Sequence, residues 1–187
     1  MPNWTENYVE ISGNPESIKE LKELVKNGER LFSFNKILPM PDALCITSGS
    51  SVWDGLKILD RNDLEAWLKL TPKIREEVRR AVGNMNAYGV KDWYDWCNYH
   101  WGTKWDACDV TMSDPDDDSV TYSFNTAWCG PEPVAKALRE MFPELEISWQ
   151  CLDEDATAVR NEEVEDEDAD DAWLFPCIDE NPNTYEI

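Results

Sequence analysis

The sequence predicts an α+β fold: a ferredoxin-like antiparallel sheet covered by helices on one face, with a helical insertion and an acidic C-terminal extension. Residues 108–112 and 120–126 both alternate polar with apolar side chains across a short acidic turn, which predicts a hairpin with one covered face. Helical apolar stripes lie on both sides of this hairpin in the sequence. The chain is 42% hydrophobic and contains 10 Trp in 187 residues, so it can form a packed core.

The first part of the chain predicts the order strand, helix, strand. Residues 4–11 form the first strand, and Asn14-Pro15 begins a helix, with Asn as the cap and Pro in the first turn. Asn27-Gly28 ends that helix. Residues 31–37 (LFSFNKI) alternate and predict a second strand that stops before the prolines at 39 and 41.

The middle of the chain predicts a helical insertion, at about residues 53–100. A loop over residues 41–52 precedes it, and a short helix covers residues 63–70. A longer helix begins at Thr71-Pro72 and ends at Gly83, and the last helix covers residues 91–100. The inward positions of the longer helix are expected to be Ile74, Val78 and Val82.

The last part adds a helix and a strand to the predicted hairpin. Gly130-Pro131 begins the helix, and residues 147–151 alternate as a strand. The inner face of the helix is expected to carry Val134, Leu138 and Met141. The order strand, strand, helix, strand fits a ferredoxin-like sandwich, with the first strand-helix-strand part folded against it. The predicted domains are therefore residues 1–152, with the insertion, and an acidic extension of residues 153–187.

Several sequence blocks resemble a family of phage and plasmid proteins that carry the YubB ferredoxin-like domain. The blocks are MPNW at the start, FNKILPMP (34–41), WGTKWDA (101–107), FNTAW (124–128) and PEP (131–133). Their order and spacing are similar to the family pattern over residues 1–151. The chain departs from that pattern at Thr5, where the family often has Cys, and at Cys129-Gly130-Pro131. The resemblance implies the fold and a mobile-element origin, and it implies no reaction.

The charge of the chain is strongly negative and is concentrated near its end. The formal charge is 17 − 39 = −22, and residues 153–187 hold 14 acids and one base, or −13. Phosphates would repel such a chain, which excludes a simple nucleic-acid binder and a protein held on anionic lipid. Glu162–Asp171 has eight acids in ten residues. This run is typical of a solvated tail, or alternatively of a DNA mimic, because extended carboxylates approach the charge density of a duplex.

The mimic interpretation leads to the main functional hypothesis. The protein would be a non-enzymatic inhibitor, carried by a phage or mobile element, of a host DNA-targeting defence nuclease (anti-CRISPR or anti-restriction). It would occupy the nucleic-acid channel of a CRISPR effector or restriction enzyme in the bacterial cytoplasm, since the N-terminus has no secretory signal pattern. Trp173-Leu174-Phe175 would pin the run to the folded body. The expected partner-binding residues are Glu162, Glu163, Glu165, Asp166, Glu167, Asp168, Asp170 and Asp171, with Asp116, Asp117 and Asp118 as a second patch.

A second hypothesis is an interaction module that binds a host protein through a Trp-rich surface. Trp93, Trp96, Trp101 and Trp105 would form that surface, and the acidic end would serve only solubility. Within WGTKWDA, we favour a structural role, in which Gly102 permits a sharp helix-to-strand junction and the indoles cover the end of the sheet. Nucleic-acid binding by Lys104 and these indoles is the alternative.

A catalytic or metal site is not expected, and no cofactor is predicted. The six cysteines form no C-x-x-C pair and are expected to stay reduced in a cytosol, mostly as small core residues. Cys97 and His100 would need an orienting third group to act as a nucleophile pair. The acidic turn copies the start of a calcium loop but has Ser119 where glycine is needed and Asn125 where glutamate is needed.

Overall fold

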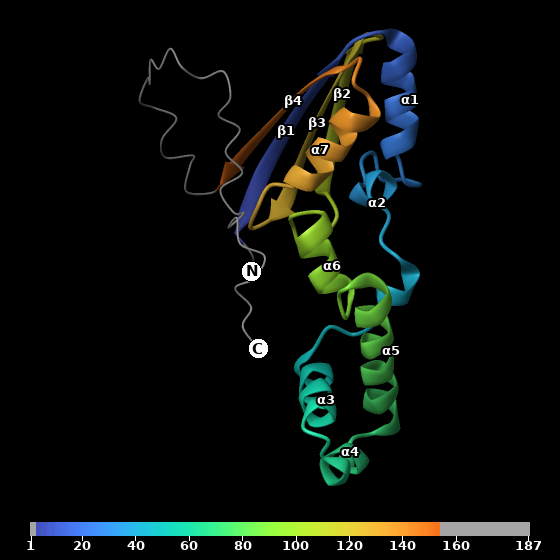
Figure 1. Cartoon of the computed structure of the whole chain (residues 1–187). Coiled ribbons are helices and arrows are strands. Elements are labelled where there is room, and N and C mark those ends of the chain that lie inside the picture. Colours follow the sequence, from blue (N-terminus) through green and yellow to red (C-terminus); the bar gives the residue numbers. More distant parts are fainter. Residues whose placement is uncertain (1–2, 154–187) are drawn as a thin grey trace, which may run out of the picture. The chain divides into compact units, whose positions relative to one another are not determined.

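The computed structural model describes residues 3–153, which divide into two compact units (Figure 1). One is the ferredoxin-like unit, with described residues 3–39 and 100–153, and the other is the helical unit, Met40–Tyr99. The ferredoxin-like unit contains β1 (Trp4–Ser12), α1 (Pro15–Val25), α2 (Phe34–Ile37), β2 (Cys108–Asp116), β3 (Ser119–Ala127), α7 (Glu132–Met141) and β4 (Glu146–Asp153). The α+β fold class predicted from the sequence is confirmed.

The sheet has four antiparallel strands in the order β2-β3-β1-β4, the order of a ferredoxin-like fold. Val9 in the middle of β1 pairs with Tyr122 of β3 on one side and with Trp149 of β4 on the other. The first strand therefore lies inside the same sheet as the last three. The prediction of a separate strand-helix-strand part folded against this sheet was wrong.

Helices α1 and α7 cover one face of the sheet (Figure 1). Asn14 caps α1 as predicted, since its side chain accepts a hydrogen bond from the Ser17 N–H at 2.9 Å. Between helices and sheet lies an aromatic core, in which Phe32 stacks on Phe124 with ring centroids 5.3 Å apart. Trp149 and Tyr122 are also fully buried there. Met141 of α7, predicted to face inward, is 46% exposed instead.

The segment 31–37 is not the predicted strand: Phe34–Ile37 form the short helix α2. Asp106 explains the difference. Its carboxylate accepts hydrogen bonds from the Phe34 N–H and the Ser33 hydroxyl, both at 2.6 Å, and so satisfies the start of the helix. The alternation in the sequence arises because Phe32 and Phe34 are both buried in the same core. None of the described sheet strands pairs with the segment 31–37.

The helical unit contains a 3-10 turn (Asp42–Leu44), α3 (Ser50–Asp60), α4 (Leu64–Lys69), α5 (Pro72–Tyr88) and most of α6 (Trp93–His100). Its core consists of Ile46, Val52, Val78 and Ala81, with Leu56, Trp67 and Ile74 packed against it. The predicted loop over residues 41–52 thus contains the 3-10 turn and the start of α3.

Helix α5 begins at the predicted cap, Thr71, but it runs through Gly83 and ends at Gly89, which has a φ of 76°. Asn84 accounts for the longer helix, because its side-chain amide donates to the carbonyls of Ala43 and Lys91 and fixes another turn inside the unit. Val82, predicted to point inward, is 36% exposed. None of the helices within residues 3–153 has both the length and the apolar character needed to cross a bilayer.

Candidate protein-interaction surface

Charge is divided unequally between the two layers of the ferredoxin-like unit. Its strands and hairpin turn contain nine acidic residues and neither Lys nor Arg: Glu6, Glu10, Asp109, Asp114, Asp116, Asp117, Asp118, Glu146 and Asp153. The rest of residues 3–39 and 100–153 balances eight acids (Glu16, Glu20, Glu23, Glu29, Asp106, Glu132, Glu140, Glu144) with eight bases (Lys19, Lys22, Lys26, Arg30, Lys36, Lys104, Lys136, Arg139). The whole negative charge of the described part of this unit, 8 − 17 = −9, therefore comes from the strand layer.

Strand alternation places Glu6, Glu10 and Glu146 on the face opposite α1 and α7, and Asp109 lines a hollow on the same face. In β1, Thr5, Asn7, Val9 and Ile11 are buried, whereas the residues between them are exposed. The helices α1, α2 and α7 of this unit do not cover its second face, which we call the open face (Figure 1). Asp114 does not belong to this face, because it forms an ion pair with Lys22 of the covering helix α1. Glu6, Glu10, Asp109 and Glu146 form no ion pair with another of the described residues.

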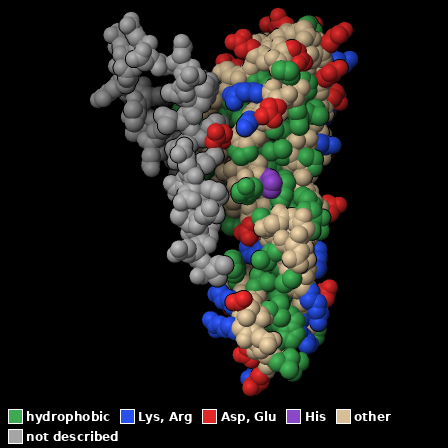
Figure 2. Space-filling view, viewed as in Figure 1, with side chains coloured by type: hydrophobic (Ala, Val, Ile, Leu, Met, Phe, Trp, Pro, Cys, Tyr) green, Lys and Arg blue, Asp and Glu red, His purple; other side chains and the backbone are tan. Residues whose placement is uncertain are grey.

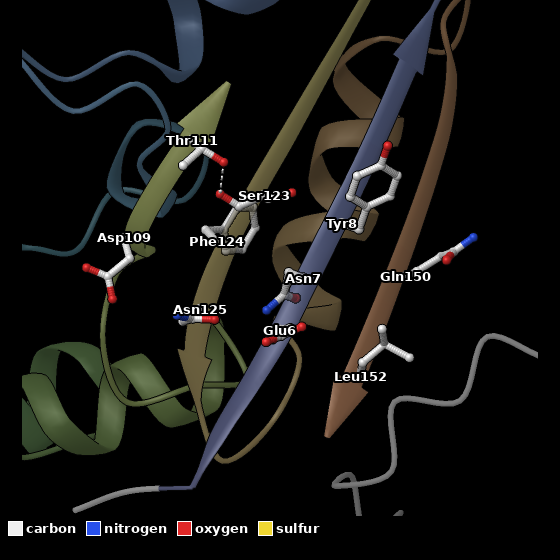
Figure 3. Close-up of a pocket in the computed structure, with 10 residues that line it drawn as sticks. All are labelled: Glu6, Asn7, Tyr8, Asp109, Thr111, Ser123, Phe124, Asn125, Gln150 and Leu152. Carbon is white, nitrogen blue, oxygen red and sulfur yellow. Dashed lines mark hydrogen bonds between the residues drawn. The ribbon is translucent and has the colours of Figure 1, made fainter. Parts of the chain in front are cut away.

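A shallow hollow of about 520 Å³ lies on the open face (Figure 3). Polar side chains of all four strands line it, among them Glu6, Asp109, Ser123, Asn125 and Gln150. The pairing of β2 with β3 is irregular between Cys108 and Thr111, and Asp109 lies in this bulge with a φ of 53°. The hollow thus combines carboxylates with neutral hydrogen-bonding groups, which suits a basic or polar group of a partner.

More acidic residues gather at the end of the sheet that holds the hairpin turn. Asp116, Asp117 and Asp118 are exposed there, and the Gly13 N–H donates to the Asp118 carbonyl at 3.0 Å. Ser12, the last residue of β1, pairs with Ser119 and with Glu146. The turn is therefore next to the start of β4, and Figure 2 shows acidic side chains gathered at this end.

The predicted main acidic patch, residues 162–171, lies outside the described residues. The chain leaves the described structure at Asp153, which pairs with Thr5 at the end of the sheet opposite the turn. The nine peptide steps from Asp153 to Glu162 span up to about 30 Å, whereas β4 is roughly 23 Å long. The chain is thus long enough for both predicted patches to belong to one surface.

The predicted Trp-rich surface is largely core. Trp96 and Trp101 are 6% and 5% exposed, and Trp93 and Trp105 are half-buried. The Trp101 indole donates to the Leu38 carbonyl at 2.9 Å and packs edge-on against Phe34. These aromatic residues therefore stabilise the fold, as the structural interpretation of WGTKWDA predicted.

Sequence reasoning missed the exposed tryptophans, Trp53 and Trp128, which are 51% and 43% exposed. Strand alternation gave no signal for Trp128, because an unbroken alternation would place it on the same face as the buried Thr126. The alternation of β3 ends where Thr126 and Ala127 are both buried. Trp128 lies at this break with a φ of 71°.

Of the residues considered for catalysis, Cys97 is buried and His100 is half-buried. Cys97 is 2% exposed, and its sulfur lies 3.9 Å from the Met40 sulfur, so a substrate has no access to it. Burial lowers the pKa of His100 and so favours its neutral form. Within residues 3–153, no group of three or more His, Cys, Asp or Glu side chains is arranged to hold a metal ion.

Comparison with known proteins gives a distant structural neighbour. No protein-family model matches the chain, and no curated protein matches it. Among solved structures, it is similar to protein api92 from Yersinia pseudotuberculosis, of the family DUF1281, at 13% identity and a TM-score of 0.46. The similarity covers 82% of this chain and 91% of that one. A similarity at this level carries no statement about function.

Proposed function

We propose that the protein is a non-enzymatic inhibitor, carried by a phage or mobile element, of a host nuclease that targets DNA. Its acidic surface would occupy the Lys- and Arg-lined channel in which a CRISPR effector or restriction enzyme holds nucleic acid, in the cytoplasm of a bacterial cell. The observation that supports this most is the charge division within the ferredoxin-like unit, where nine strand-layer acids have no basic neighbour in the same layer.

A partner built to bind phosphates is attracted to any rigid, uncompensated row of carboxylates. Duplex DNA has one charge per about 1.7 Å of axis. Glu6 and Glu10 are about 13 Å apart along β1 at roughly 3.3 Å per residue, which is sparser than DNA. The strand layer therefore contributes a negative electrostatic field on one side of the unit. The eight acids of residues 162–171 would contribute the charge density that mimicry of DNA requires.

Both faces of the unit contain exposed acids, which provides a matched experiment. One variant replaces three open-face acids (Glu6→Gln, Glu10→Gln, Glu146→Gln), and its control replaces three acids of the helical face (Glu20→Gln, Glu23→Gln, Glu140→Gln). Both raise the net charge equally. A third variant converts the eight acids of residues 162–171 to Ser and Asn. Each is used to capture purified nuclease–guide and restriction complexes at low and high salt, with DNA as competitor.

We expect the unmodified protein to capture a complex that DNA displaces and salt releases. The open-face variant should lose about tenfold in affinity, at roughly 0.5 kcal/mol per exposed charge contact. The eight-acid variant should lose capture, and the helical-face control should keep it. Equal losses in the open-face variant and its control would contradict a shaped surface. Capture that resists salt and ignores DNA would instead favour the second hypothesis, binding through aromatic residues, with Trp128 and Trp53 as its exposed candidates.

A further inference from the structure

A cluster of aromatic rings around one ammonium group lies at the end of the sheet opposite the hairpin turn. Lys104 Nζ is 4.1 Å from the ring centroid of Trp105 and 4.8 Å from that of Trp128. The Trp4 and Trp105 rings are 6.1 Å apart. We call Trp4, Lys104, Trp105 and Trp128 the tryptophan–lysine cluster. It offers aromatic surface and a positive charge in a unit whose strand layer is otherwise acidic.

Hydrogen bonds between several segments of the chain hold this cluster in place. The Trp128 N–H donates to the Asn3 carbonyl at 3.0 Å, and the buried Thr103 hydroxyl donates to the Ala127 carbonyl at 3.0 Å. Gly102 has a φ of 76°, and a Cβ there would lie 3.0 Å from Pro133 Cδ. The indoles are thus positioned before any ligand arrives, which lowers the entropy lost on binding.

The C-terminal extension starts beside this cluster. Thr5 pairs with Asp153, the last described residue of β4, and the preceding residue, Trp4, pairs with Ala127. Trp128 follows Ala127 directly. Neighbouring strands lie about 4.8 Å apart, so the extension leaves the sheet within a few residues of the exposed Trp128 indole.

From this placement we propose that a segment of the extension, Asp170–Phe175, docks on the tryptophan–lysine cluster. Its sequence, DDAWLF, joins two acids to two aromatic residues. Trp173 and Phe175 would pack on the exposed indole, and the carboxylates would lie near the Lys104 ammonium. A tethered segment has an effective concentration of the order of millimolar, so a weak contact suffices. The proposal goes beyond the proposed function and does not depend on an inhibited partner.

Electrostatics favours this end of the sheet over the rest of the open face. A run with eight acids in ten residues would be repelled by Glu10 and Glu146 toward the hairpin-turn end of the open face, since neither forms an ion pair among the described residues. Lys104 instead provides an attractive charge where the extension begins. Docking of the aromatic residues here would hold the acidic run against the folded unit.

The test uses the full chain with 5-fluorotryptophan and ¹⁹F NMR, in which the Trp128 signal is assigned from a Trp128→Phe variant. We expect the double change Trp173→Ala and Phe175→Ala to shift the Trp128 signal. The buried Trp149 reports on folding and should stay in place. A matched control, Tyr185→Ala, removes an aromatic residue outside the segment and should shift neither signal.

An unmoved Trp128 signal in the double variant would overturn the proposal. The proposal would also be overturned if dilution of the unmodified protein moved its Trp128 signal to the position found in the double variant. The docked segment would then come from a second copy of the protein. The NMR experiment contains only the isolated protein, so a negative result does not affect the inhibitor proposal. In the same way, a failure to capture nuclease complexes does not affect the docking proposal.

Discussion

Asn7 shows how a single buried polar side chain organises the sheet. Its amide donates to the Thr5 carbonyl at 3.0 Å and to the Thr126 hydroxyl at 2.9 Å. Its carbonyl oxygen accepts from Trp149 Nε1 at 3.1 Å and from Cys151 Sγ at 3.2 Å. One residue of β1 thus bonds to side chains of both neighbouring strands, and a register shift would leave these groups unsatisfied.

Asn7→Ala should therefore lower the free energy of unfolding by about 1–3 kcal/mol, because the buried Trp149 N–H loses its acceptor. Asn125→Ala is the control, since Asn125 belongs to the same sheet but lies on the open face. We expect it to change stability by less than about 0.5 kcal/mol. Urea unfolding followed by circular dichroism measures both, and equal effects would contradict the role of Asn7.

At the scale of elements, the close packing of α3 on α5 depends on a glycine. A Cβ at Gly55 would lie 2.4 Å from Val78 Cγ2, and Val78 is fully buried in the core of the helical unit. Valine has few accessible rotamers, so it cannot move aside at low energy. Gly55 is thus required for packing, although glycine is a poor helix former.

Gly55→Ala should destabilise the protein by about 1–3 kcal/mol through overpacking. Adding Val78→Ala makes room for the new methyl group, so the double variant should be more stable than the sum of the single changes predicts.

Gly83→Ala is the control, and it should change the free energy of unfolding in the opposite direction. Gly83 lies inside α5, and apart from its chain neighbours and the backbone of its own helix no atom lies within 4 Å of a Cβ built there. This change should stabilise by about 0.5–1 kcal/mol in thermal or urea unfolding; destabilisation there would argue against this account of packing.

Elements with strong local signals were predictable from the sequence, and those set by distant contacts were not. The β2–β3 hairpin was predicted from sequence alternation, which the burial of β3 follows, and α1 from its Asn14-Pro15 cap. The helix at 34–37 depends on Asp106, which is about 70 residues away in sequence. The open face could not be predicted, because it depends on the strand order. That order places the polar side chains of four separate strands next to one another. Sequence composition could locate the acids but could not reveal that the strand layer lacks bases.

At the scale of the whole molecule, charge distinguishes the two units. Met40–Tyr99 contains eight bases and nine acids, a net charge of −1, against −9 for the described residues of the ferredoxin-like unit. The helical unit is therefore nearly neutral, and long-range electrostatic effects on stability should originate in the ferredoxin-like unit.

Neutralising the hairpin turn tests this uneven distribution. The triple change Asp116→Asn, Asp117→Asn and Asp118→Asn should raise the urea midpoint at low salt, because adjacent like charges repel, and the gain should fade as salt screens them. The helical-face control, Glu20→Gln, Glu23→Gln and Glu140→Gln, should produce a smaller gain, since lysines and arginines are interleaved with these acids. A salt-independent gain in the triple variant would rule out repulsion as its cause.

The central position of β1 has a consequence for the order in which the protein folds during synthesis. Thr5 pairs with Thr126 and with Asp153, which follow it by 126 − 5 = 121 and 153 − 5 = 148 positions. The contacts between α3 and α5, by contrast, all lie within Met40–Tyr99. Because distant pairings form slowly, the helical unit can complete its core while the first strand on the ribosome still has no partner. β1 is therefore synthesised long before its neighbour β4, and the sheet cannot be completed until β4 has left the ribosome.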